Sequence, residues 1–105
     1  MNGQSTQPIY SSYASDETMT ELIEMFVDEL PNRAAVVKQA ADEAQWDSLR
    51  SISHQLKGAA PGYGFEAVGE AAGHVERLVM DHAQADQVLD AVESLLSLCD
   101  RVAKS

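Results

Sequence analysis

The chain has 105 residues, a length that suits one domain with one hydrophobic core. Its 17 acidic and 7 basic residues give a net charge of −10, which disfavours nucleic acids and anionic membranes as partners because both attract positive surfaces. The apolar runs are too short for a transmembrane helix, the N-terminus lacks the basic and apolar regions of a secretory signal, and the single cysteine, Cys99, cannot form an internal disulfide. We therefore expect a soluble, cytoplasmic protein.

The N-terminal segment is polar and contains Gly3, Pro8 and several serines. We expect residues 1–14 to form a flexible arm and residues 15–105 to form one helical domain. From Asp16 onward the apolar residues recur at helical spacing, and no segment alternates between apolar and polar residues as a half-buried strand does. The domain is therefore predicted to be all-α.

The first helix is predicted to begin near Asp16 and to end at Leu30. Thr18 and Glu21 have the spacing of a capping box at its start. Pro31 follows Leu30, and we expect a break or sharp kink there because the residue before a proline disfavours helical angles. Proline is well tolerated in the first turn of a helix, so a second helix is expected to start directly afterwards.

Four further helices are predicted by apolar stripes that repeat with a helical period. They cover approximately residues 32–44, 46–60, 65–81 and 84–102. Because the connections between them are short, neighbouring helices should run antiparallel. The expected fold is an antiparallel up-down-up-down four-helix bundle, with the helix before Pro31 as an additional N-terminal helix across one end or flank. Cys99 falls within the last apolar stripe and is expected to be a small core residue.

A histidine, a lysine and a glycine lie close together in the stretch HQLKGAAPGYG, which begins at His54. Each helical residue advances about 100° around the axis, so His54 lies roughly 140° from Leu49, near the centre of the apolar stripe, and faces solvent or the edge between helices. Lys57 and Gly58 follow at i+3 and i+4 and share this face. A glycine inside a helix costs stability, which indicates that another molecule approaches closely here.

An exposed imidazole in this setting can act as a nucleophile. A neutral imidazole is a competent nucleophile, and a neighbouring lysine suits an imidazole that first stays neutral and then carries an anion. The chain has neither a Walker loop nor the glycine-rich loop of a kinase, so the sequence indicates no nucleotide-phosphate site. The alternative is an ordinary surface histidine beside a neutral glycine.

The same residues resemble the motif of histidine-containing phosphotransfer (HPt) domains. That motif reads His, any residue, Leu, Lys, Gly, then five residues and a Gly or another small residue. It is matched in this chain by His54, Leu56, Lys57, Gly58 and Gly64. The wider resemblance spans about residues 16–102, and it departs from the family pattern in the proline and the extra glycines that follow the motif.

The resemblance implies a protein that relays a phosphoryl group between receiver-domain aspartates, or accepts it from a histidine kinase, without an ATP site or kinase activity of its own. It implies that His54 is the phosphorylated residue, that Lys57 lies by the phosphoryl group and that Gly58 keeps the approach open. Glu76 occupies the family position beside the imidazole, where glutamine is frequent, and we expect its carboxylate to accept the proton of one ring nitrogen. The resemblance implies no cofactor in this chain, Mg²⁺ on the partner receiver domain, and a monomer.

Two other functions remain open on the sequence. One is a non-phosphorylated adaptor or inhibitor built on the same bundle, in which His54 is dispensable. The other is a hydrolytic or acid–base enzyme that uses His54, although no serine, cysteine or carboxylate constellation supports it. His74 and His82 are predicted to lie on one helix without a metal-ligating partner at i+3 or i+4, so neither is expected to bind a metal.

Overall fold

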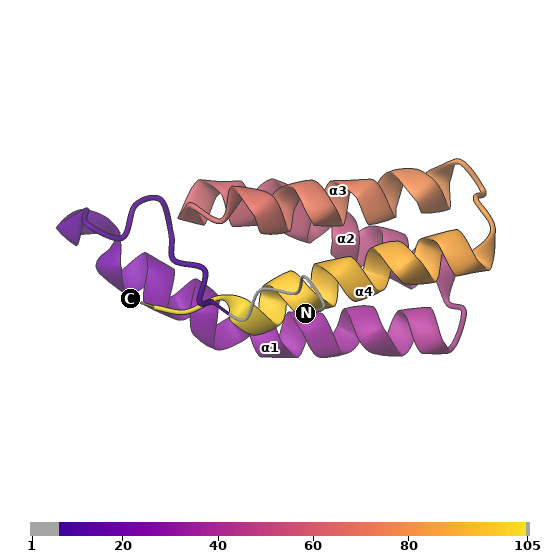
Figure 1. The fold of residues 1–105 in the computed structure, drawn as a ribbon, viewed down its shortest axis with the longest axis horizontal. Coiled ribbons are helices and arrows are strands. Elements are labelled where there is room, and N and C mark those ends of the chain that lie inside the picture. Colours follow the sequence, from indigo (N-terminus) through magenta and orange to yellow (C-terminus); the bar gives the residue numbers. More distant parts are fainter. Residues whose placement is uncertain (1–6, 105) are drawn as a thin grey trace.

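The computed structural model describes residues 7–104 and folds them into four α-helices. Their bounds are α1 Thr20–Asp42, α2 Trp46–Ala59, α3 Glu66–Met80 and α4 Ala85–Arg101, with 3₁₀ turns η1 Glu17–Met19 and η2 Ala60–Tyr63. Successive helices run in opposite directions along the long axis (Figure 1). The prediction of an all-α four-helix bundle is confirmed. No helix in the described part of the chain is both long and apolar enough to cross a membrane.

The predicted break at Leu30 is wrong, because α1 continues through Pro31. The buried stripe of α1 includes Ile23, Phe26 and Leu30 before the proline and resumes with Val37 after it. Breaking the helix at Pro31 would separate these two halves from one core, whereas keeping it costs one backbone hydrogen bond on an exposed face. The additional N-terminal helix and the second predicted helix are therefore one element.

The start of α1 also differs from the prediction. Asp16, rather than Thr18, caps the chain: its carboxylate accepts a hydrogen bond from the Thr18 backbone N–H at 3.0 Å. This cap begins the 3₁₀ turn η1, which leads directly into α1. The capping-box hydrogen bonds expected between Thr18 and Glu21 do not occur among those described for this segment.

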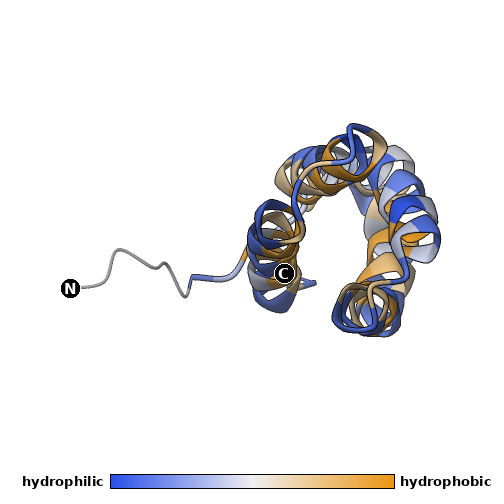
Figure 2. Cartoon of the chain, turned by 90° about the vertical axis from the view of Figure 1, so that its right-hand side faces the viewer, coloured by the Kyte–Doolittle hydropathy of each residue, from blue (hydrophilic) through white to orange (hydrophobic). Residues whose placement is uncertain are grey.

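The core is formed by the inner faces of the four helices. Each helix packs against its neighbours in the chain, and α1 also packs against α4. At the end where α2 turns into α3, Phe26 stacks on Tyr63 and Phe65 with ring centroids 4.9 and 5.6 Å apart. Viewed along their axes, the four helices lie side by side with their apolar residues mainly on the inner side (Figure 2).

The described part of the predicted N-terminal arm, residues 7–14, is attached to the bundle by hydrogen bonds, and residues 1–6 lie outside the described residues. The Ile9 N–H donates to the Arg101 carbonyl at 2.8 Å, which joins the segment to the end of α4. Ser11 is buried, and its hydroxyl donates to the Tyr63 carbonyl at 2.6 Å. The segment therefore links the end of α4 to the turn between α2 and α3.

Gly64 is expected to be required for this link. Its φ of 88° lies in the left-handed region, and a Cβ there would run into Ser11 Oγ and the Ser12 backbone nitrogen. We expect Gly64→Ala to destabilise the fold by roughly 1–3 kcal/mol. Gly62→Ala is the matched control, because a Cβ at Gly62 meets nothing within 4 Å. Urea unfolding of the two variants measures the difference, and equal stabilities would contradict this account.

Candidate functional site

His54 projects from the outer face of α2. Leu49, Ser53 and Leu56 form the buried face of this helix. The His54 side chain is 68% exposed, in agreement with the direction given by the helical spacing. Its Nδ1 atom nevertheless has a fixed partner, because Glu76 Oε2 on the neighbouring helix α3 lies 2.8 Å away.

The contact with Glu76 favours one tautomer of the neutral imidazole. A carboxylate only accepts hydrogen bonds, so the proton of the neutral ring lies on Nδ1, between the two side chains. The second ring nitrogen, Nε2, then keeps its lone pair and is free of this contact. Glu76 thus lies beside the imidazole, as expected.

Lys57 is the second partner of this carboxylate. Its Nζ lies 3.4 Å from Glu76 Oε1, so the two carboxylate oxygens face one lysine and one histidine. The lysine stem lies against α3 at Gly73, where a Cβ would be 3.4 Å from Lys57 Cδ. The stem is thus close-packed on α3 on its way to Glu76.

The charge state of Glu76 follows from opposing effects. Burial raises its pKa, since only 7% of the residue is exposed. The hydrogen bonds from His54 and Lys57, together with the charge of Lys57, lower the pKa by more, so that it falls below the ordinary 4.5. Glu76 is therefore a buried but ionised carboxylate at neutral pH.

Gly58 leaves an open surface one turn beyond His54. The residue is exposed, and a Cβ built there would have no heavy atom within 4 Å. No neighbouring element of the bundle therefore requires a glycine at this position, unlike Gly64. The open surface is available to a molecule that approaches the imidazole.

A shallow hollow of about 420 Å³ adjoins the imidazole. Its lining consists of Asp47, Arg50, Ser51, His54, Gln55 and Glu76. Arg50 is a cation that our sequence reasoning missed, although it lies four residues before His54 and thus on the same helical face. Arg50 lies one helical turn before His54, and Lys57 lies one turn after it, so a positive residue lies on each side of the imidazole.

The other two histidines lie apart from this cluster. His74 is exposed on α3. The prediction that His82 shares its helix is wrong, because α3 ends at Met80 and His82 has a φ of 54° in the turn that follows. Among residues 7–104, no group of three or more His, Cys, Asp or Glu side chains could hold a metal ion.

The fold and the site define a helical bundle that presents one exposed imidazole, backed by a buried carboxylate. Comparison with known families agrees with this class: the family model described as Hpt domain matches residues 21–105. The chain belongs to the Hpt domain family. No curated protein and no solved structure matches the chain.

Family membership implies histidine phosphotransfer in a phosphorelay. Hpt domains in general are phosphocarriers without kinase activity, and they interact with receiver domains and histidine kinases. The resemblance seen in the motif from His54 to Gly64 is thereby confirmed at the level of the family.

Proposed function

We propose that this protein accepts a phosphoryl group on His54 and exchanges it with the aspartates of receiver domains, acting as a monomer. The observation that carries the proposal is the 2.8 Å contact between His54 Nδ1 and the Glu76 carboxylate, on an imidazole that is otherwise exposed. This contact leaves Nε2 directed away from the bundle with its lone pair available. A histidine without such a role gains little from a buried, ionised partner.

The transfer step begins when the Nε2 lone pair attacks the phosphorus of a receiver's aspartyl phosphate. An N–P bond forms, the P–O bond to the aspartate breaks, and its electron pair leaves with the receiver carboxylate. The proton stays on Nδ1, so the ring becomes a cation, and Glu76 balances its charge. Lys57 and Arg50 are the cations that flank the phosphoryl oxygens.

The other groups needed for phosphoryl transfer are proposed to belong to the partner. Phosphoryl transfer depends mainly on positioning and on charge stabilisation, so a rigid helix that presents one nucleophile is sufficient on this side. We propose that the receiver domain supplies Mg²⁺ and the acidic residues that hold it, and that this chain needs no cofactor of its own.

Gly58 is proposed to admit the receiver to His54. We expect Gly58→Leu to slow transfer at least about tenfold, because a side chain on the open surface keeps the reacting atoms apart. The same change is expected to raise the unfolding free energy by about 0.5–1 kcal/mol, since leucine favours a helix more than glycine does. Gly58→Ala should stabilise similarly and slow transfer less. Transfer kinetics and urea unfolding separate the two effects, and unchanged transfer in Gly58→Leu would remove Gly58 from the site.

The proposal is tested by incubating the protein with phosphorylated receiver domains and Mg²⁺. We expect labelled phosphate to appear on this chain in a form that is labile in acid and stable in alkali, as phosphohistidine is. A lack of label with every one of several receivers would overturn the proposal in favour of a non-phosphorylated adaptor.

A further inference from the structure

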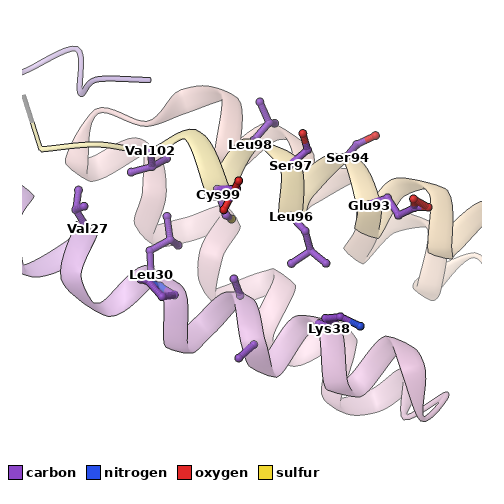
Figure 3. Close-up of a pocket in the computed structure, with 14 residues that line it drawn as sticks. Val27, Leu30, Lys38, Glu93, Ser94, Leu96, Ser97, Leu98, Cys99 and Val102 are labelled. Atoms are coloured by element: carbon purple, nitrogen blue, oxygen red, sulfur yellow. The ribbon is translucent and has the colours of Figure 1, made fainter. Parts of the chain in front are cut away.

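A groove with a volume of about 1090 Å³ runs between α1 and α4 (Figure 3). Its apolar lining includes Val27, Leu30, Ala34 and Ala35 from α1, and Leu96 and Cys99 from α4. None of its lining residues comes from α2 or α3, whereas the hollow beside His54 is lined only by those two helices. The groove is therefore a second feature, separate from the phosphotransfer site.

The groove lies along the line where α1 and α4 pack against each other. Leu96 projects from α4 toward α1 (Figure 3), and both it and Val27 are only half-buried. On α4 the lining runs from Glu93 to Asp100, which is a helical length of roughly 12 Å. A further helix of similar length, laid over this groove with its apolar side inward, would cover these side chains.

The charged side chains around the groove indicate which charge a helix bound there would carry. Glu93 and Asp100 lie in its lining, and the one cation there, Lys38, is paired with Asp42 at 2.7 Å. The whole chain carries a net charge of −10, so a second copy of it would be repelled. An occupant with basic residues beside its apolar face would instead find unpaired carboxylates to meet.

We propose that the groove between α1 and α4 binds a basic amphipathic helix of a partner protein. The apolar face of the helix packs against Val27, Ala34 and Leu96, and its lysines or arginines meet Glu93 and Asp100. Because His54 lies on the α2–α3 side, a partner held in the groove leaves the imidazole free to react. The inference rests on the groove and goes beyond the proposed phosphotransfer.

Cys99 provides a direct probe of occupancy, since it is the only cysteine in the chain and it lines the groove. Burial raises the pKa of its thiol to about 11, so we expect modification by N-ethylmaleimide to be slow enough to follow in time. The binding probe is a synthetic helix of about 18 residues with leucines on one face and lysines on the other, long enough to be helical when bound. One control peptide has the same composition without an amphipathic face, and another has glutamates in place of the lysines.

We expect the basic amphipathic peptide to slow the modification of Cys99 at least about tenfold, and neither control peptide to do so. Ala35→Arg, in the groove, should weaken the binding of this peptide about tenfold or more. The matched variant Ala67→Arg, another exposed alanine but on α3, adds the same charge and should leave binding nearly unchanged. Phosphoryl transfer to His54 should be the same in both variants.

Three results would overturn the inference. If the control peptide of the same composition without an amphipathic face bound as well as the amphipathic peptide, binding would be due to charge alone. Equal weakening by Ala35→Arg and Ala67→Arg would place the peptide elsewhere. A dimer in sedimentation whose formation protects Cys99 without peptide would assign the groove to a second copy of the chain.

Discussion

His54→Gln is expected to abolish the transfer of phosphate from a phosphorylated receiver domain and to leave the fold intact. Glutamine keeps a polar side chain of moderate size but has no nitrogen that can form a bond to phosphorus. Because the His54 side chain is 68% exposed, its loss removes no core packing, and the unfolding free energy should change by less than about 0.5 kcal/mol. The measurement is the labelling of the variant by the receiver, with circular dichroism and urea unfolding to follow the fold.

The matched control is His74→Gln. His74 is also exposed on a helix of the same bundle, but it is not among the residues in contact with Glu76. This variant should be labelled at the rate of the unmodified protein. Persistent label on His54→Gln together with its loss on His74→Gln would move the phosphorylated residue to α3 and contradict the role proposed for the α2 face.

The fold could be predicted from the sequence wherever one apolar stripe determines one helix. The spacing of apolar residues gave α2, α3 and α4 to within a few residues. It failed at Pro31, where a local rule about the preceding residue predicted a break. The buried residues on both sides of the proline belong to the same core, and this tertiary packing is not visible in a window of a few residues.

Some features of the site could likewise be predicted from the sequence, and others could not. The exposure of His54 follows from its position on one helix and was predictable, and the i−4 position of Arg50 would have found that residue as well. The pairing of Lys57 with Glu76 depends on how α2 and α3 are aligned. Helical periodicity within one segment contains no information about that alignment, so the sequence could indicate Glu76 only through family resemblance.

The alignment has a consequence for stability, because it lowers the pKa of Glu76 in the folded protein below the ordinary 4.5. A carboxyl group whose pKa is depressed by folding adds stability that is complete above its unfolded pKa and is lost as the pH falls through its folded pKa. The difference in unfolding free energy between the wild type and Glu76→Gln should therefore shift against the wild type as the pH falls below about 4.5.

Glu76→Ala is expected to slow phosphoryl transfer to His54 roughly 10–100-fold, because the imidazole then loses both its tautomer bias and the counter-charge for its cationic product. Glu76→Gln keeps an oxygen that accepts the Nδ1 proton but has no charge, so its rate should lie between those of Glu76→Ala and the wild type. Nitrogen NMR of the His54 ring distinguishes this role from a merely structural one: the proton should reside on Nδ1 in the wild type and in Glu76→Gln, and exchange between both nitrogens in Glu76→Ala. A Glu76→Ala protein with the wild-type rate and the wild-type tautomer would show that the 2.8 Å contact does not orient the nucleophile.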